Sequence, residues 1–323
     1  MKILVSPLNW GLGHASRCVP LVRRFIAEGH EVILGGDGES LTLLRRHFPK
    51  LRYVYLAPLT LRYSSGKRQV LAMLKSLPRL IAWSMKDHSI LQAVLREEHI
   101  DQIVSDNRFG LYNQNAKCIY MTHQLHIMLP KCWKWLEGVA ERLHARVYKR
   151  FDEVWIPDYE DLSLSLAGEL SHPKTVHGTY RYIGPLSRFE RLKEHEKESG
   201  FAVVAVLSGL EPQRSMLESE LLSRFAGKEK QVLIIQGRLN KPRTQIKRGN
   251  ITLVPYMNDA ELVSVLSGAK HIIARSGYST IMDLHALGLL NDSTTIELIP
   301  TPGQPEQEYL SYAQQTRNIP AAI

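Results

Sequence analysis

Residues 2–14, KILVSPLNWGLGH, decide the fold that this chain is expected to adopt. Residues 3–5 are apolar without alternation, as in a strand that is covered on both faces of its sheet. A turn containing Gly11 and Gly13 follows, and a helical pattern then occupies residues 15–28. A buried strand that passes through a glycine turn into a helix predicts the first unit of a parallel α/β sheet.

The same alternation of short apolar runs and helical patterns continues through the first half of the chain. We expect strands at 2–8, 31–35, 51–57, 101–105, 118–122 and 153–157. We expect helices between them at 15–28, 39–47, roughly 67–98 and 131–150. Strands that alternate with helices predict βαβ units and therefore a parallel sheet.

A second alternating series begins after a highly charged stretch at 188–200, RFERLKEHEKESG, which we interpret as a linker. We expect its strands at 201–207, 231–236, 251–255, 271–274 and 294–299, and its helices at 212–226, 258–268, 278–288 and 305–317. The sequence therefore predicts an α/β protein with two Rossmann-like domains. The N-terminal domain would span 1–187 and the C-terminal domain 201–323, consistent with a length of 323 residues.

Composition is typical of a folded globular protein and excludes several classes. Hydrophobic residues make up 44% of the chain and charged residues 23%, which excludes an intrinsically disordered chain. The three cysteines (Cys18, Cys118 and Cys132) are too widely spaced for a disulfide framework or a metal site. No apolar run is long enough for a transmembrane helix, and the first residues lack a signal-peptide pattern. We therefore expect a cytoplasmic protein.

The net charge of +9 lies almost entirely in the first half of the chain. Residues 1–160 carry 23 Lys and Arg against 15 Asp and Glu, whereas residues 161–323 carry 18 against 17. This excess favours an anionic partner, namely a lipid surface, a phosphorylated substrate or nucleic acid, unless it forms only a solvated basic face. Residues 67–86 and 131–150 mix Lys and Arg with Trp, Leu and Met at near-helical spacing. They suit an anionic membrane surface, the alternative being helices packed on the sheet with basic outer faces.

The turn after the first strand carries candidate catalytic residues. Gly11 and Gly13 would let the backbone approach a ligand, and the following helix N-terminus favours an anion, although a tight structural turn is the alternative. His14 lies at the carboxyl edge of the predicted sheet, where a neutral imidazole can take a proton from a hydroxyl. Such a base needs a partner for its other ring nitrogen. Asp106 ends another strand at the same edge and is the candidate for that role.

The same glycines also fit a different class of enzyme. Gly11-x-Gly13, with Asp37 at the end of the second strand, is similar to a dinucleotide-binding fingerprint, although Ser16 stands where a third glycine is usual. This pattern favours, as an alternative, a NAD-dependent oxidoreductase.

Two loops of the second half are suited to a diphosphate. Each follows a predicted strand and opens a helix, so that free backbone N–H groups and small residues lie together, although a capping motif would explain either loop alone. The candidate residues are Ser208, Gly209, Arg214, Ser276, Gly277 and Tyr278.

Further groups downstream suit a nucleotide sugar. Asp283 lies seven residues beyond Ser276, about two helical turns, where its carboxylate can accept from two ribose hydroxyls. Residues 300–308, PTPGQPEQE, form a turn rich in Pro that leads into a helix with amides and acids at its start. Such groups suit sugar hydroxyls, because each hydroxyl both donates and accepts.

Together these residues resemble the GT-B glycosyltransferases, and in particular glycosyltransferase family 28, the MurG-like UDP-N-acetylglucosamine transferases. The resemblance rests on residues 11–14 and, more specifically, on 275–283 and 300–309. It implies two Rossmann-like domains that face a central cleft, with the acceptor on the N-terminal domain and the nucleotide sugar on the C-terminal domain.

The resemblance also implies roles for residues of the second half. It places the diphosphate at Ser208, Gly209 and 276–278, the nucleotide base beside Met257, the ribose on Asp283, and the donor sugar on Gln307 and Glu308. Asp283 stands where this family has Glu, and Glu308 stands where a second Gln is usual.

We therefore expect an inverting, metal-independent glycosyltransferase. It would move a hexose or an N-acetylhexosamine from a UDP-sugar to a hydroxyl acceptor such as a lipid-linked or cell-envelope glycan. The sequence has no Asp-x-Asp pair and no metal-binding motif, so we expect no metal and no cofactor besides the UDP-sugar. The alternatives are a UDP-sugar epimerase of the same fold, the NAD-dependent oxidoreductase, and a non-catalytic lipid or nucleic-acid binder. On the transferase interpretation no nucleic-acid partner is expected, and the protein would lie in the cytoplasm or on the inner face of the membrane.

Overall fold

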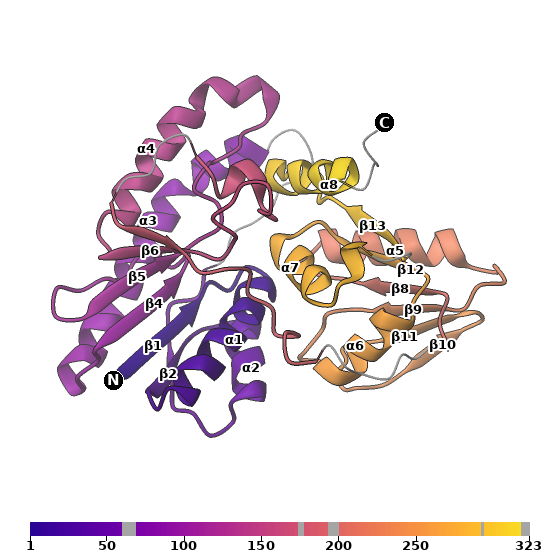
Figure 1. Cartoon of the computed structure of the whole chain (residues 1–323), viewed down its shortest axis with the longest axis horizontal. Coiled ribbons are helices and arrows are strands. Elements are labelled where there is room, and N and C mark those ends of the chain that lie inside the picture. The colour runs from indigo at the N-terminus through magenta and orange to yellow at the C-terminus, as the bar shows by residue number, and fades with distance from the viewer. Residues whose placement is uncertain (60–68, 174–177, 193–199, 292–293, 318–323) are drawn as a thin grey trace. The chain divides into compact units, whose positions relative to one another are not determined.

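The computed structural model describes residues 1–59, 69–173, 178–192, 200–291 and 294–317. The chain divides into two compact units, each built on one β-sheet (Figure 1). The first unit comprises Met1–Asn9, His14–Leu186 and Pro302–Glu306. The second unit comprises Trp10–Gly13, Ser187–Thr301 and Gln307–Ile323.

The sheet of the first unit has, within the described ranges, seven parallel strands in the order β3-β2-β1-β4-β5-β6-β7. The strands are β1 (Lys2–Pro7), β2 (Glu31–Gly36), β3 (Tyr53–Tyr55), β4 (Gln102–Asp106), β5 (Lys117–Met121), β6 (Glu153–Ile156) and β7 (Tyr180–Tyr182). The connecting helices are α1 (Gly13–Ala27), α2 (Gly38–His47), α3 (Gln69–Glu97) and α4 (Glu137–Tyr148), with short 3₁₀ helices at Lys131–Leu136 and Gly168–Leu170. The central strands carry apolar side chains on both faces, because helices cover both; Ile3, Leu4 and Val5 of β1 are all buried.

The sheet of the second unit has six strands in the described part, in the order β10-β11-β9-β8-β12-β13. They are β8 (Val203–Val206), β9 (Val232–Ile235), β10 (Ile246–Arg248), β11 (Ile251–Val254), β12 (His271–Arg275) and β13 (Thr295–Ile299). The helices are α5 (Gln213–Phe225), α6 (Asp259–Gly268), α7 (Tyr278–Ala286) and α8 (Pro305–Arg317), with a 3₁₀ turn at Leu289–Asn291. All neighbouring strands are parallel except β10, which pairs antiparallel with β11 at the edge.

The structure confirms the predicted α/β class and corrects three details. The expected strands did not include two short edge strands, β7 and β10, because their residues are mostly exposed and carry no apolar pattern. The helix expected at 131–150 begins as a 3₁₀ helix and becomes α-helical only at Glu137. The charged stretch interpreted as a linker is partly packed into the second unit: Phe189 is 1% exposed, and Arg188 pairs with Asp259. Residues 193–199 of that stretch, and residues 67–68 of the expected long helix, lie outside the described residues.

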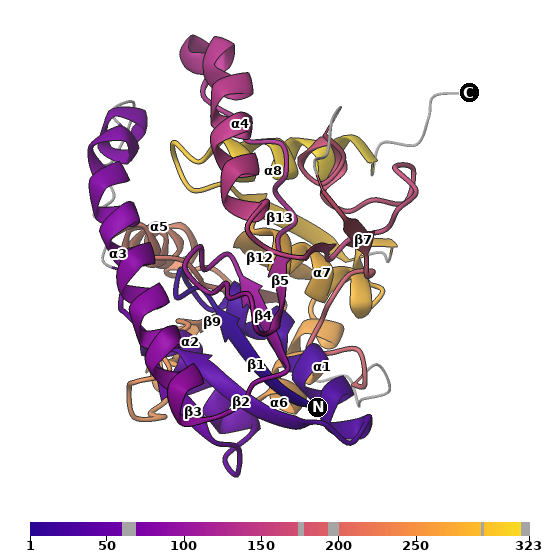
Figure 2. The same cartoon turned by 90° about the vertical axis from the view of Figure 1, so that its left-hand side faces the viewer.

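Helices α3 and α4 extend beyond the strands of the first sheet (Figure 2). Because α3 has 29 residues, it is about 43 Å long, whereas the six residues of β1 span only about 20 Å. The C-terminus of α3 lies close in sequence to the start of β4, so the surplus length projects past the carboxyl ends of the strands. Among the described residues, no helix combines the length and the apolar character that crossing a bilayer requires.

Candidate functional site

Each sheet has a point at which the order of its strands reverses. In the first sheet, β2 and β3 lie on one side of β1 and β4 lies on the other. In the second sheet, β9 and β11 lie on one side of β8, and β12 and β13 lie on the other. Open parallel sheets bind ligands at such switch points, outside the carboxyl ends of the strands. The loops after β1 and β4, and those after β8 and β12, therefore define one candidate site in each unit.

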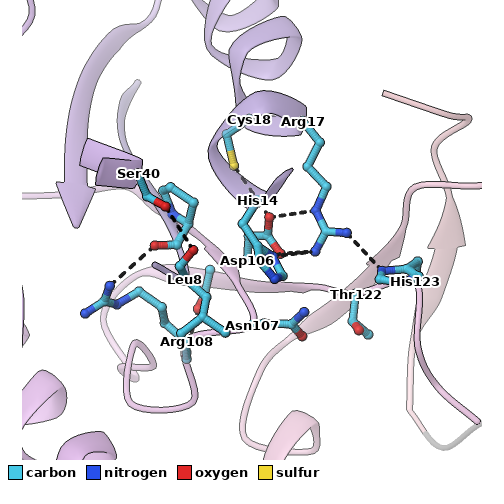
Figure 3. A network of polar contacts seen from close by, with 12 residues as sticks. Leu8, His14, Arg17, Cys18, Ser40, Asp106, Asn107, Arg108, Thr122 and His123 are labelled. Carbon is cyan, nitrogen blue, oxygen red and sulfur yellow. Dashed lines mark hydrogen bonds and ion pairs between the residues drawn. The ribbon is translucent and has the colours of Figure 1, made fainter. Parts of the chain in front are cut away.

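The switch point of the first sheet brings His14 and Asp106 together (Figure 3). Asp106 is the last residue of β4 and is fully buried, and His14 lies in the first turn of α1. The Nδ1 atom of His14 lies 2.9 Å from Oδ1 of Asp106. A carboxylate bound to one ring nitrogen orients the imidazole and makes the other nitrogen the one that exchanges protons with a substrate. The geometry suits a general base, and the catalytic role of both residues stays a prediction.

Arg17, one turn further along α1, binds the same carboxylate. Its Nε donates to Oδ2 of Asp106 at 2.7 Å, and its Nη2 donates to Oδ1. Burial alone would raise the pKa of Asp106, but the charge of Arg17 and the hydrogen bonds from Arg17 and His14 hold the pKa of this carboxyl well below its usual range. Asp106 is therefore ionised at neutral pH, and its negative charge is balanced by a guanidinium that is only 2% exposed.

Arg17 also binds His123, which follows β5 at the same edge of the sheet (Figure 3). The Nη1 atom of Arg17 lies 2.9 Å from Nδ1 of His123. A guanidinium only donates, so this nitrogen accepts and the proton of the neutral ring sits on Nε2. Burial lowers the pKa of His123, which favours the neutral ring. The sequence did not predict Arg17 or His123, although the spacing of three residues places Arg17 on the same helix face as His14.

Gly11 lies in the turn that precedes α1, Gly13 is the first residue of α1, and both belong to the second unit. Gly11 has a φ of 80°, in the left-handed region that glycine adopts most readily. A Cβ atom at position 13 would collide with the hydroxyl of Ser279, in the first turn of α7. Position 13 therefore favours a glycine, because a larger residue would force the Ser279 side chain to move.

Asp37 does not occupy a ribose-binding position, which corrects the dinucleotide interpretation. It is 6% exposed, and both of its carboxylate oxygens are engaged. Arg108 donates to Oδ1 at 2.7 Å, and the Asn9 amide donates to Oδ2 at 2.9 Å. The same Arg108 is completely buried and also pairs with Asp87. Asp37 therefore anchors a buried ion-pair network, and the oxidoreductase alternative loses the acid on which it depended.

The switch point of the second sheet carries most of the predicted donor-binding residues. Ser208 and Gly209 follow β8, and Gly209 has a φ of 96°. Ser276 follows β12, and Gly277 is the N-cap of α7, which begins at Tyr278. The first N–H groups of α7 therefore start beside the carboxyl end of β12, the geometry that favours a phosphate.

Gln307 lies next to this loop, whereas Glu308 and Met257 form no hydrogen bond or ion pair with it in the described part of the chain. The Ser276 hydroxyl donates to the backbone carbonyl of Gln307 at 2.8 Å. The Gln307 side-chain oxygen accepts from the backbone N–H of Thr301 at 2.8 Å and so holds the turn before α8. Glu308 is exposed on α8, and Met257 is partly buried in the loop between β11 and α6.

Asp283 lies in the second turn of α7, and the Ser187 hydroxyl donates to its Oδ1 at 2.6 Å. Burial raises the pKa of Asp283 to about 6, and the effects of Arg188 and Ser187 offset this only in part. The sequence did not predict a role for Ser187, the residue directly before the charged stretch at 188–200.

Arg214 does not fit the phosphate-binding role predicted for it. Its guanidinium is 4% exposed and pairs with Glu211 and with Glu218, at 2.9 Å from the latter. A further donor of Arg214 is bound to the hydroxyl of Ser215 at 2.8 Å. A buried cation with two carboxylate partners stabilises the start of α5, so we remove Arg214 from the donor-binding set.

Within the described residues, no group of three or more His, Cys, Asp or Glu is arranged to hold a metal ion.

Comparison with known proteins relates the chain to glycosyltransferases. No family model matches it. It is 24% identical over 321 residues to an uncharacterized glycosyltransferase of Methanosarcina acetivorans, covering 95% of this chain and 82% of that protein. The solved structure of the spinosyn rhamnosyltransferase SpnG complexed with thymidine diphosphate matches with a TM-score of 0.57 and 14% identity, covering 97% of this chain and 84% of the other. The Arabidopsis thaliana enzyme UGT89C1 complexed with UDP-L-rhamnose matches with a TM-score of 0.53 and 14% identity, covering 98% and 90%. These likenesses confirm the predicted GT-B class of fold, two α/β sheets that are mostly parallel.

Proposed function

We propose that this protein is an inverting, metal-independent glycosyltransferase that transfers a sugar from a UDP-sugar to a hydroxyl acceptor. The observation that carries the proposal is the pairing of His14 with Asp106 at the switch point of the first sheet. This pairing gives a general base in the unit that would bind the acceptor. The loops at the second switch point supply a helix N-terminus for a diphosphate in the other unit.

In the proposed reaction, Nε2 of His14 removes the proton of the acceptor hydroxyl as its oxygen attacks the anomeric carbon. The new bond joins the acceptor oxygen to that carbon, and the bond between the carbon and the diphosphate oxygen breaks. Attack on the side opposite the leaving group inverts the anomeric configuration. Asp106 stabilises the imidazolium that forms. The N–H groups at the start of α7 stabilise the negative charge of the departing diphosphate.

A UDP-sugar is proposed as the donor for two reasons. The resemblance to family 28 implies UDP-N-acetylglucosamine, and UGT89C1, which shares the fold, is complexed with UDP-L-rhamnose. Because SpnG is complexed with thymidine diphosphate, the same fold also accommodates another base. We therefore propose a hexose or N-acetylhexosamine on UDP, with Asp283 accepting from the ribose hydroxyls and Gln307 and Glu308 near the sugar. We also propose membership of glycosyltransferase family 28, and a donor other than a UDP-sugar would count against it.

The surface of α3 and α4 supports an acceptor that is carried by a membrane. Two stripes of apolar side chains recur every four residues on the projecting part of the first unit and are exposed to 43–76%: Leu77, Ile81 and Met85 on α3, and Trp135, Val139 and Leu143 beside and along α4. Exposed Lys and Arg residues surround the second stripe: Lys131, Lys134, Arg142, Arg146, Lys149 and Arg150. Apolar side chains framed by basic ones fit the surface of an anionic bilayer. We propose peripheral binding to the inner face of the membrane and a lipid-linked or cell-envelope acceptor.

The test is an assay of the full chain with UDP-glucose, UDP-N-acetylglucosamine and the corresponding dTDP-sugars, with membrane lipid extract as the source of acceptor. The proposal expects release of UDP together with a lipid-bound glycoside of inverted configuration. Conversion of the UDP-sugar into its epimer, with no acceptor consumed, would assign the protein to the epimerase alternative instead.

A further inference from the structure

Asn107, the residue directly after Asp106, has an unusual backbone conformation. Its φ is 58°, and it is the only non-glycine residue with a positive φ in the described part of the chain. Glycine would adopt this conformation without a steric cost, whereas any side chain is disfavoured there and Asn is among the least disfavoured. Residues held in such conformations concentrate at functional sites, which directs attention to the Asn107 side chain.

A hydrogen bond from a buried residue holds the Asn107 side chain in one orientation. The hydroxyl of Tyr120, a fully buried residue of the neighbouring strand β5, donates to Oδ1 of Asn107 at 2.7 Å. The same hydroxyl oxygen lies 3.0 Å from Nε2 of His144 on α4. Since the tyrosine proton is used on Asn107, the bond from His144 requires a proton on its Nε2. Burial lowers the pKa of His144 to about 4, so the ring is neutral at neutral pH and is fixed in this tautomer.

This arrangement turns the amide NH₂ group of Asn107 away from the core. Because Oδ1 is fixed by Tyr120, Nδ2 points in the other direction, and it has no hydrogen-bond partner among the residues that the structure describes. The two neighbours in the chain, Asp106 and Arg108, are completely buried, whereas Asn107 is partly exposed. Asn107 is therefore the residue of this loop that offers a free donor at the switch point, beside the partner of His14 (Figure 3).

We propose that Asn107 recognises the acceptor, with Nδ2 donating a hydrogen bond to an oxygen adjacent to the reacting hydroxyl. The acceptor class that fits is a sugar or another polyol, in which a vicinal oxygen lies next to the nucleophile, and not a simple alcohol. This inference rests on the proposed function, because it assumes that the switch point of the first unit binds the acceptor. An oriented amide discriminates against an acceptor without that oxygen, because such an acceptor covers the amide donor and leaves it without a hydrogen-bond partner.

Two substitutions distinguish the effect of the Asn107 amide group from the effect of the backbone conformation at this position. N107G removes the amide and relieves the backbone, but it also removes the acceptor of the buried Tyr120 hydroxyl, so urea unfolding of both variants is measured to confirm that they are folded at the assay temperature. N107D keeps the size of the side chain and an oxygen for Tyr120, but replaces the NH₂ donor by an acceptor. Binding of UDP, measured by calorimetry, should be the same in both variants and wild type, because UDP belongs to the second unit.

The probes are hexyl β-D-glucoside and 1-hexanol, which differ only in the sugar with its vicinal hydroxyls. The side-chain NH₂ resonance of Asn107, identified in ¹H–¹⁵N spectra by its loss in N107D, should shift with hexyl glucoside and not with hexanol. In transfer assays, KM for the glucoside should rise about tenfold in N107G and N107D, with a smaller change in kcat. The KM for hexanol should not change.

Two results would overturn the inference: an Asn107 resonance that the glucoside leaves in place, or variants that keep the wild-type preference for the glucoside. A different result would count against the proposed function alone. If the resonance shifts with the glucoside while no UDP-sugar is consumed, Asn107 binds a polyol but the protein is not a transferase.

Discussion

The Nδ1 atom of His14 lies 2.9 Å from Oδ1 of Asp106, although 92 residues separate them in the sequence. The pairing of parallel strands accounts for this proximity. Pro7, at the end of β1, is in register with Asp106, at the end of β4, and α1 begins six residues after Pro7. The two side chains therefore meet because a helix start and a strand end share the edge at which the strand order reverses.

The first prediction concerns the ion pair beneath His14. Asp106→Asn should destabilise the protein by about 3–5 kcal/mol, because it leaves the buried Arg17 guanidinium without its carboxylate. It should also lower kcat by about 10²–10⁴-fold, since His14 loses the charge that orients it. Urea unfolding and steady-state assays check the two effects.

A matched double variant tests the physical reason. Arg17→Met combined with Asp106→Leu removes both charges and should recover most of the lost stability, but none of the activity. A double variant that is as unstable as Asp106→Asn would show that the buried charge is not the cause.

The second prediction concerns the pH dependence of stability at Asp283. Burial raises the pKa of this carboxyl to about 6, so the folded protein holds a proton there that the unfolded chain has already lost above an ordinary pKa of 3.8. The stabilising effect of that proton is complete below about pH 4 and is lost as the pH rises through about 6. Asp283→Asn should therefore be more stable than wild type at pH 7.5, by at most about 3 kcal/mol. The difference should vanish at pH 4, and a difference that is equal at both values would contradict the prediction.

The third prediction separates Asp283 from Arg214 in nucleotide binding. Asp283→Ala should weaken UDP binding by about 10- to 100-fold, because the charged acceptor for the ribose hydroxyls is lost. Arg214→Met should lower the stability of the protein and leave the affinity for UDP unchanged, since the guanidinium forms ion pairs with Glu211 and Glu218. Calorimetric titration with UDP checks both variants. If both variants lost affinity for UDP to the same extent, Arg214 would have to be counted among the donor-binding residues again.

The fourth prediction concerns the apolar stripe that includes Trp135 and Leu143. The double variant Trp135→Glu, Leu143→Glu should bind vesicles of phosphatidylglycerol and phosphatidylcholine at least about tenfold more weakly than wild type. Wild-type binding should fall with added salt and with vesicles of phosphatidylcholine alone. Met216→Glu, which changes an exposed methionine of α5 in the second unit, is the control and should bind as wild type does. Co-sedimentation measures all three, and equal binding by the double variant and wild type would exclude the stripe as a membrane contact.

The sequence predicted the fold and the edges of the sheets because both depend on local patterns. Unbroken apolar runs located the buried strands, and the rule that parallel strands end at one edge placed His14 near Asp106. The expected strands missed β7 and β10, two short edge strands whose mostly exposed residues carry no such pattern.

The partners of the buried charged residues could not be predicted from the sequence, because they depend on which side chains meet in three dimensions. Arg17, Arg108 and Arg214 all lie in or beside predicted helices or turns, where an arginine is usually exposed, yet each is buried. Arg17 pairs with the carboxylate of Asp106, whereas Arg108 and Arg214 each pair with two carboxylates. Asp37 fitted a ribose-binding pattern by position, and only its contacts with Arg108 and Asn9 exclude that role. Asn107 carried no signal in the sequence, because its backbone conformation is visible only in the structure.

The measurement that tests the central claim most directly compares wild type with His14→Ala on the preferred UDP-sugar, following UDP release and the anomeric configuration of the product by NMR. The account predicts an acceptor glycoside of inverted configuration from wild type, and a kcat about 10²–10⁴-fold lower for His14→Ala with unchanged UDP affinity. A product of retained configuration, or a His14→Ala variant that keeps the wild-type rate, would contradict it.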